Sequence, residues 1–143
     1  MLIPDVNLLV YAYNSDAPSH TEAKRWFEEA MSGTERVGFA WVVMLGFLRL
    51  MSGRDVLLNP LGSSEAIGII RSWLSRRIAV VVQPGPAHLE ILESLAAGIG
   101  TAGRMTTDLH IASVAIELEA TVVSNDLDFR RFPGLRVRDP LAG

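Results

Sequence analysis

The sequence predicts an α/β domain in three layers, with a central, mostly parallel sheet between two layers of helices. Short apolar, β-branched runs alternate along the chain with longer segments in which apolar residues recur every three or four positions. That alternation is typical of strands and helices that follow one another in a parallel sheet. The chain has 143 residues, 49% of them apolar, which suits one domain with a substantial core. We therefore expect a single domain over residues 1–143.

The first predicted elements are a strand and two helices. The apolar residues 2–4 predict a strand that ends at Pro4 or lies at a sheet edge, because proline has no N–H to donate to a ladder. Residues 8–13 predict a short buried helix. Ser19 and Glu22 have the spacing of a capping box, in which each side chain accepts a backbone N–H, so we expect a helix from there to about residue 32.

The middle of the chain predicts a second strand over residues 37–39 and a buried helix over 41–52 that ends at Gly53. After a loop, another helix is expected from Ser63 to about Arg77. Its broad apolar surface consists of Ile67, Ile69, Ile70, Trp73 and Leu74. Such a surface either packs into the core or forms a groove for a second copy of the chain or a partner protein.

The remaining elements continue the alternation. The β-branched run 79–82 predicts a buried strand, and residues 87–97 predict a helix after a proline-rich turn. We expect a strong helix over 107–119 and a strand over 121–124, and Val137 marks a last edge strand.

The composition excludes several classes of site. The chain lacks cysteine, so it has no disulfide, zinc-thiolate site or cysteine nucleophile. Its net charge of −3 argues against a general basic coat for nucleic acid but is compatible with a local patch. The longest apolar run, residues 38–48, is shorter than the roughly 20 residues that span a bilayer. The start of the chain lacks the basic region of a signal peptide, so we expect a cytoplasmic protein without a membrane partner.

Three aspartates fall where predicted strands end or helices begin. Asp5 ends the first strand, Asp126 follows the strand over 121–124, and Asp108 lies in the first turn of the helix before it. Taken singly, each has a structural explanation as a turn residue or as a charge at a helix start. Because the carboxyl ends of parallel strands meet at one edge, we expect these aspartates and the nearby Asp128 to form a cluster that needs a cation. Oxygen ligands without histidine or cysteine favour Mg²⁺ or Mn²⁺, an ion that suits phosphodiester hydrolysis.

Two small polar residues flank the predicted cluster. Asn7 comes two positions after Asp5, and Ser124 two positions before Asp126. Each could orient a carboxylate or hold a metal-bound water. Each could equally cap the helix beside it, and the sequence leaves both roles open.

Four segments carry recognisable motifs: Ile3–Ala12, Thr107–Ala115, Val122–Phe129 and Phe132–Leu135. Together, and in this order, they resemble PIN domains, especially the VapC toxins of bacterial toxin–antitoxin pairs. The resemblance implies a PIN-like fold and a Mg²⁺- or Mn²⁺-dependent endoribonuclease. It further implies a homodimer and a cognate VapB-type antitoxin that covers the active site. The residues that match the family's metal-binding acids are Asp5, Asp108 and Asp126, with Asp128 as an accessory catalytic acid.

One position departs from the family pattern. Many members carry a glutamate in the helix after the second strand, where this chain has Gly46. The missing acid leaves a second metal in question and is the sole support for an alternative, a non-catalytic PIN-fold protein that binds RNA or a partner. Arg49 shares the face of Gly46 and either balances the acids and holds a phosphate or forms a structural ion pair.

For the enzyme we expect hydrolysis by a metal-activated water. A bound divalent ion would lower the pKa of a water, which would attack the phosphorus in line while the bond to the 3′-oxygen breaks, so the products would carry a 5′-phosphate and a 3′-hydroxyl. Asp128 or Ser124 orients the water. Arg104 or Arg49 contacts the phosphates of an RNA that is single-stranded at the cleaved bond.

Two other kinds of site match parts of the sequence. Residues 98–103 have the G-x-G-x-x-G pattern of dinucleotide-binding folds but follow a predicted helix rather than a strand, so the required βαβ unit is missing. A phosphotransfer site of the haloacid-dehalogenase or receiver type usually needs a lysine, and the single lysine is Lys24, in an early helix. The three histidines, His20, His88 and His110, form no recognisable ligand pattern and are expected to be solvated or part of the core.

Overall fold

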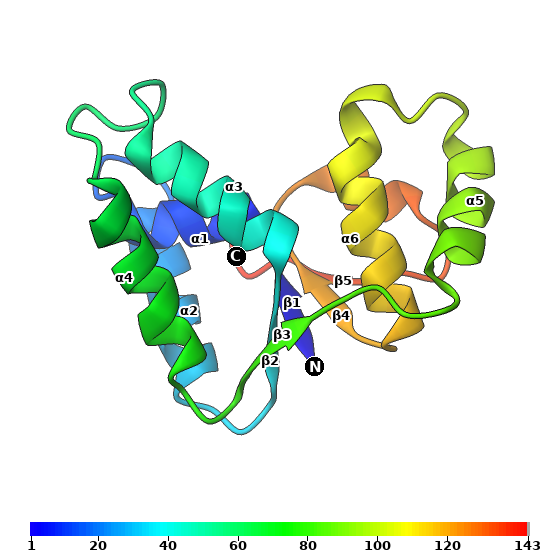
Figure 1. The fold of residues 1–143 in the computed structure, drawn as a ribbon, viewed down its shortest axis with the longest axis horizontal. Helices are drawn as coiled ribbons and strands as arrows, with labels where there is room; N and C mark the ends of the chain where they lie inside the picture. The colour runs from blue at the N-terminus through cyan, green and yellow to red at the C-terminus, as the bar shows by residue number, and fades with distance from the viewer. Residues whose placement is uncertain (143) are drawn as a thin grey trace.

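The computed structural model describes residues 1–142, and within them five parallel strands form one sheet in the order β3-β2-β1-β4-β5 (Figure 1). Each neighbouring pair is parallel, so the predicted α/β fold with a mostly parallel sheet is confirmed. All carboxyl ends of the strands therefore lie along the same edge. The strands are β1 (Leu2–Pro4), β2 (Val37–Ala40), β3 (Ala79–Val82), β4 (Thr121–Val123) and β5 (Arg136–Arg138).

Helices cover the sheet in two layers, as predicted. In Figure 1, α1 to α4 lie on one side of the strands, and α5 and α6 lie on the other. Helix α1 packs against α2 and α3, α3 packs against α4, and α5 packs against α6. The helices are α1 (Val6–Tyr13), α2 (His20–Met31), α3 (Trp41–Ser52), α4 (Ser63–Leu74), α5 (His88–Ile99) and α6 (Thr106–Glu117), with short 3₁₀ helices η1 (Gly103–Met105) and η2 (Leu127–Arg131). None of these helices is long and apolar enough to cross a membrane.

The core lies on both sides of β1, whose three residues are all buried. Because β1 is the middle strand, Pro4 ends the strand and does not lie at an edge of the sheet. Between the sheet and α1 to α4, an aromatic cluster surrounds Trp73, which is only 2% exposed. Its ring centroid lies 4.7 to 5.9 Å from those of Tyr13, Phe27, Phe39 and Phe47. The Nε1–H of Trp73 donates a hydrogen bond of 2.9 Å to the Tyr13 hydroxyl, so the buried indole is satisfied.

Three local predictions differ from the structure. Ser19 precedes α2 but its side chain makes no capping hydrogen bond, so the capping box is absent. The helix expected to reach about Arg77 ends at Leu74. Strand β3 is not fully buried, because it lies at the edge of the sheet, and Val81 is 38% exposed. The place of a strand in a sheet is set by the whole topology, which the strand's own residues do not reveal.

Candidate active site

Four aspartates lie around the carboxyl edge of the sheet. Asp5 follows β1 and caps α1, Asp108 lies in the first turn of α6, and Asp126 and Asp128 lie at the start of η2. One carboxylate oxygen from each of Asp108, Asp126 and Asp128 lies within 4.8 Å of the other two. Two segments far apart in sequence, the start of α6 and the start of η2, thus bring three carboxylates close enough to share one cation, and we call these three the acidic cluster.

Asp5 lies beneath this group and is 3% exposed. Its Oδ1 accepts a hydrogen bond of 2.7 Å from the N–H of Val6, and its Oδ2 accepts one of 2.9 Å from the Ser124 hydroxyl. Burial raises the pKa of this carboxyl, the two hydrogen bonds oppose that rise, and the charge of Asp126 adds to it. The close group thus includes Asp128, and Asp5 adjoins it through Ser124 and through its charge on Asp108, so the ligand set of Asp5, Asp108 and Asp126 stays a prediction.

Ser124 connects the buried acid to the exposed ones. It is 2% exposed, donates to Asp5, and accepts a hydrogen bond of 3.0 Å from the N–H of Asp126. Asp126 Oδ1 in turn accepts a hydrogen bond of 2.9 Å from the N–H of Asp128. A continuous chain of hydrogen bonds therefore fixes the segment after β4 relative to the end of β1.

The charges of the surrounding residues shift the pKa of Asp108. Its pKa is raised from 3.8 to about 6, first by burial and then by the charges of Asp5, Asp126 and Asp128, while Arg104 opposes the rise. A cation between these carboxylates would remove the repulsion. The donor set consists only of carboxylate oxygens, which fits a hard divalent ion such as Mg²⁺ or Mn²⁺.

The raised pKa of Asp108 predicts that the metal-free protein loses stability as the pH rises from about 4 to 6. In that window the folded protein keeps a proton that the unfolded chain, with a pKa of 3.8, has released, so a rise in pH favours unfolding. Because Asp108 is partly exposed, the effect stays below the roughly 3 kcal/mol that a two-unit shift gives without solvent screening. Thermal unfolding in EDTA should show a higher midpoint at pH 5 than at pH 7. Asp108→Asn should shrink that difference, and an unchanged difference would contradict the assignment.

Two arginines and one asparagine complete the predicted set. Arg104 Nη1 lies 3.1 Å from Asp128 Oδ2 on a side chain that is 77% exposed, so this cation reaches the cluster from its solvent side. Arg49 is exposed on α3, and its side chain has no hydrogen bond or ion pair to any of residues 1–142. Asn7 is exposed, and the side chain that caps α1 is that of Asp5. The structure therefore brings Ser124 and Arg104 into contact with the acids, whereas the Asn7 side chain forms no hydrogen bond with them.

The other kinds of site considered from the sequence lack the structures that they require. The G-x-G-x-x-G residues 98–103 begin within α5 and follow no strand. Lys24 is exposed on α2, where its Nζ lies 3.9 Å from Glu28. No lysine therefore reaches the carboxylates for phosphotransfer.

One contact in the structure has no local signal in the sequence. His88 Nε2 and His110 Nδ1 are 3.0 Å apart between α5 and α6, although 22 residues separate them in the chain. Burial and the neighbouring His88 lower the pKa of His110. Only the packing of the two helices reveals this pair, because neither residue carries a local ligand motif.

Comparison with known proteins gives a consistent result. The model of the PIN domain matches residues 2–135. The chain is 40% identical over 141 residues to ribonuclease VapC33 of Mycobacterium tuberculosis, and the match covers 99% of both chains. It is 34% identical over 143 residues to ribonuclease VapC43 of the same organism, and that match covers 100% of this chain and 97% of the relative.

Solved structures resemble the fold at lower sequence identity. The crystal structure of M. tuberculosis VapC20, described as a sarcin-ricin loop cleaving toxin, has a TM-score of 0.67 at 16% identity and covers 95% of this chain and 99% of its own. The structure of VapBC2 of Rickettsia felis, bound to a promoter DNA fragment, has a TM-score of 0.68 at 18% identity. It covers 96% of this chain and 97% of its own. These two likenesses support the fold alone.

Proposed function

This chain belongs to the PIN-domain family, among its VapC-type ribonucleases, and we propose that it cleaves RNA with a divalent cation held by Asp108, Asp126 and Asp128. The observation that carries the proposal is the meeting of these three carboxylates within 4.8 Å at the carboxyl edge of the sheet. Endoribonuclease activity as the toxin of a toxin–antitoxin pair is the function that this family membership supports. The finer points, namely the ion, the residues that hold it and the partner, are our proposals.

Each residue around the cluster has a distinct part in the proposed reaction. The bound ion, Mg²⁺ or Mn²⁺, would polarise the phosphodiester and activate a water. Asp5 positions Ser124, which holds the backbone of Asp126 in place. Arg104 supplies positive charge on the solvent side of the acids, where the phosphates of an RNA strand would approach. The resulting site binds an anionic substrate although the chain as a whole is acidic.

The proposed activity predicts cleavage that depends on a divalent ion. With a pool of single-stranded RNA oligonucleotides as substrate, the wild-type protein should cut in Mg²⁺ or Mn²⁺, lose that activity in EDTA, and regain it when the ion is restored. The new ends should be 5′-phosphates and 3′-hydroxyls, as end-labelling would show. Cleavage at an equal rate in EDTA would contradict the metal mechanism, and no cleavage under any condition would favour the non-catalytic alternative.

Gly46 does not by itself support that alternative. It lies on α3, and the three clustered carboxylates come from α6 and η2, so the missing glutamate leaves their arrangement intact. The named relatives at 40% and 34% identity are ribonucleases. We therefore favour the enzyme.

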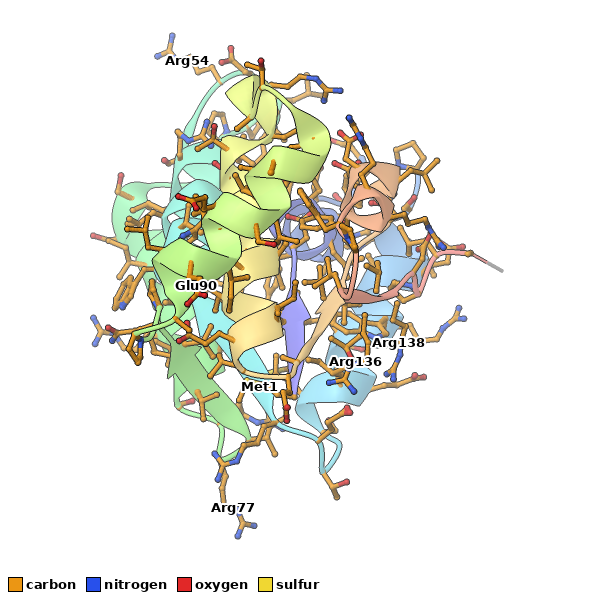
Figure 2. All side chains as sticks on the ribbon, turned by 90° about the vertical axis from the view of Figure 1, so that its right-hand side faces the viewer. Met1, Arg54, Arg77, Glu90, Arg136 and Arg138 are labelled. Carbon is orange, nitrogen blue, oxygen red and sulfur yellow. The ribbon has the colours of Figure 1, made fainter. Side chains whose placement is uncertain are left out.

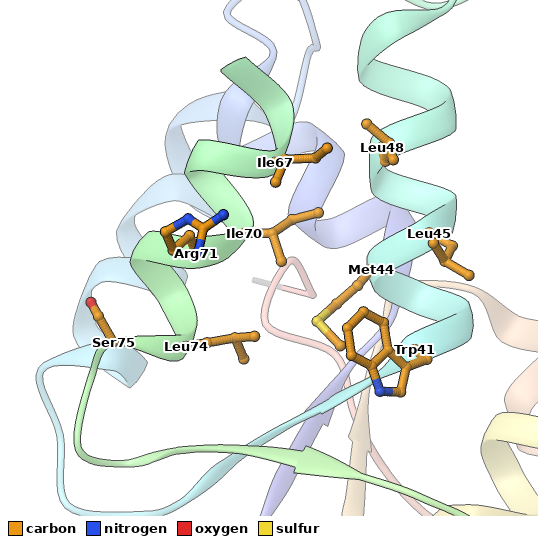
Figure 3. A pocket seen from close by; sticks show the side chains of 9 residues that line it. All are labelled: Trp41, Met44, Leu45, Leu48, Ile67, Ile70, Arg71, Leu74 and Ser75. Atoms are coloured by element: carbon orange, nitrogen blue, oxygen red, sulfur yellow. The ribbon is translucent and has the colours of Figure 1, made fainter. Parts of the chain in front are cut away.

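We propose that the partner is a VapB-type antitoxin that places an apolar helix between α3 and α4. Figure 3 shows Ile67, Ile70 and Leu74 pointing from α4 toward α3 across an open groove of about 560 Å³. Trp41 and Ile67 on its walls are 52% and 42% exposed, which is unusual for large apolar side chains and typical of a helix-binding groove. Solved neighbours of this fold include VapBC complexes, which motivates this choice of occupant. The implied homodimer stays a prediction, which sedimentation of the isolated chain would check.

A charge placed in the groove should disrupt the complex and spare catalysis. We expect Ile67→Glu to weaken binding of the antitoxin at least tenfold, because a carboxylate would be buried against apolar side chains. RNA cleavage by the isolated variant should remain at the wild-type rate. Leu89→Glu is the matched control, since Leu89 is 76% exposed on α5, in the other helical layer. Equal affinities for the two variants, measured by calorimetry, would place the antitoxin elsewhere.

A further inference from the structure

A second, smaller pocket lies beside the acidic cluster, where α1, α3 and α6 meet. Its volume is about 300 Å³, which is the lower end of the range for small-molecule sites. It is lined by Val6, Val42, Val43, Leu45, Gly46, Arg49, Thr107 and Ile111. Six of these eight lining residues are apolar, and we call this space the α3 pocket.

Two residues that line the α3 pocket are sequence neighbours of the aspartates at the candidate active site. Val6 directly follows Asp5, and Thr107 directly precedes Asp108. Both lining residues therefore lie at the starts of helices that also position the acids. A substrate whose phosphate lies at the acids would have its adjoining groups within reach of the pocket.

Gly46 keeps the α3 pocket open. On α3 it lies between Val42 and Arg49 on the same helical face, at steps of four and three residues. A Cβ atom at this position would lie 3.2 Å from Val6 Cγ2, on the opposite wall. Any larger side chain would have to occupy the space that the glycine leaves free.

Two polar groups border the apolar space. The guanidinium of Arg49 and the hydroxyl of Thr107 have no hydrogen-bond partner among residues 1–142, and both side chains are exposed. Apolar walls with a few convergent polar groups are typical of a site that binds a flat organic ring. Unpaired nucleobases are held in this way, by apolar packing and by hydrogen bonds or stacking from arginine.

We propose that the α3 pocket holds one unpaired nucleobase of the RNA, on a nucleotide next to the cleaved bond. This inference rests on the proposed ribonuclease function and adds a source of base selectivity to it. Because arginine offers only donors, it favours a base with two adjacent acceptors, and guanine presents O6 and N7 in this way. The pocket therefore favours guanine at that position.

The test compares RNA binding with and without the base that fills the pocket. Cleavage of the oligonucleotide pool by the wild-type protein with Mn²⁺ first identifies the nucleotides on both sides of the cut. Fluorescence anisotropy in EDTA then measures affinity for that oligonucleotide and for versions with an abasic residue at one or the other flanking position. We expect a flanking guanine whose removal weakens wild-type binding about tenfold.

Variants of the pocket should remove that difference. Gly46→Leu fills the pocket, and Arg49→Gln removes the guanidinium from an exposed position where folding is not at risk. In each variant, removing the base should weaken RNA binding by less than about twofold, compared with about tenfold in the wild-type protein. Arg77→Gln is the control, because Arg77 precedes β3 at the opposite end of the sheet, as Figure 2 shows. In this variant, removing the base should weaken RNA binding about tenfold, as in the wild-type protein.

The outcomes separate the inference from the proposed function. If the wild-type protein cuts RNA but neither abasic version binds more weakly, or if Arg49→Gln keeps the tenfold loss, the base-binding role is wrong and the ribonuclease function stands. The inference is also overturned if the pocket variants weaken binding of the antitoxin alone, since the occupant would then be a protein side chain. If the wild-type protein cuts no RNA with any divalent ion, the proposed function itself fails.

Discussion

Asp108→Asn is expected to lower kcat/KM for RNA cleavage at least about 100-fold while leaving the fold intact. Asp108 shares one small space with Asp126 and Asp128, so its loss removes one of three carboxylates that we propose hold the ion. Replacing a residue that only hydrogen-bonds to a metal ligand typically lowers metal affinity or activity 10- to 100-fold. Replacing a residue that binds the metal directly should lower activity further. Asparagine has nearly the same shape, and it removes a charge that three acids repel, so the metal-free variant should be at least as stable as the wild type.

Steady-state cleavage of a labelled RNA in Mg²⁺ measures this effect, and thermal unfolding in EDTA checks the fold. Asp16→Asn is the matched control, because Asp16 is an exposed aspartate outside the cluster and should keep wild-type activity. A wild-type rate for Asp108→Asn would show that the assignment is wrong. A variant that is both inactive and unfolded would contradict the expectation of an intact fold.

Trp73→Ala is expected to lower the free energy of unfolding by about 3 to 5 kcal/mol, the usual range for removing a large buried aromatic side chain. Trp73 lies at the centre of the aromatic cluster between the sheet and α1 to α4, and it is 2% exposed. Its removal leaves a cavity and also leaves the Tyr13 hydroxyl without its donor. Since Trp73 lies on α4, the loss should also loosen the groove proposed for the antitoxin.

Urea unfolding followed by far-ultraviolet circular dichroism would measure the loss. Trp41→Ala is the matched control, because Trp41 is 52% exposed on α3 and its removal should cost less than about 1 kcal/mol. Equal losses for the two substitutions would contradict the view that α4 is held to the sheet by the buried aromatic cluster.

Much of the fold could be predicted because its elements have strong local signals. The helix expected over residues 41–52 is α3 without change, since its apolar run and the following Gly53 set both ends. The burial of β3 could not be predicted, because a β-branched run has the same sequence whether its strand is central or at an edge. The capping box failed because a residue pair with the right spacing does not ensure the side-chain rotamer that a cap needs.

The candidate site was predictable in its location and only partly in its geometry. Parallel strands with acids at their ends predict that those acids gather at one edge. The group within 4.8 Å consists of Asp108, Asp126 and Asp128, and two hydrogen bonds hold Asp5 beside it, where its charge still acts on Asp108. Which carboxylate oxygens approach one another depends on side-chain conformation, which the sequence pattern does not reveal. The α3 pocket likewise has no local signal beyond an unexpected glycine at position 46.

Calorimetric titration of MnCl₂ into the metal-free protein tests the central claim most directly. The wild-type protein should bind one ion with saturable heat at neutral pH, and Asp108→Asn should lose that heat while Asp16→Asn keeps it. Absence of heat from the wild-type protein, or the same binding curve for Asp108→Asn, would contradict a cation held by Asp108, Asp126 and Asp128.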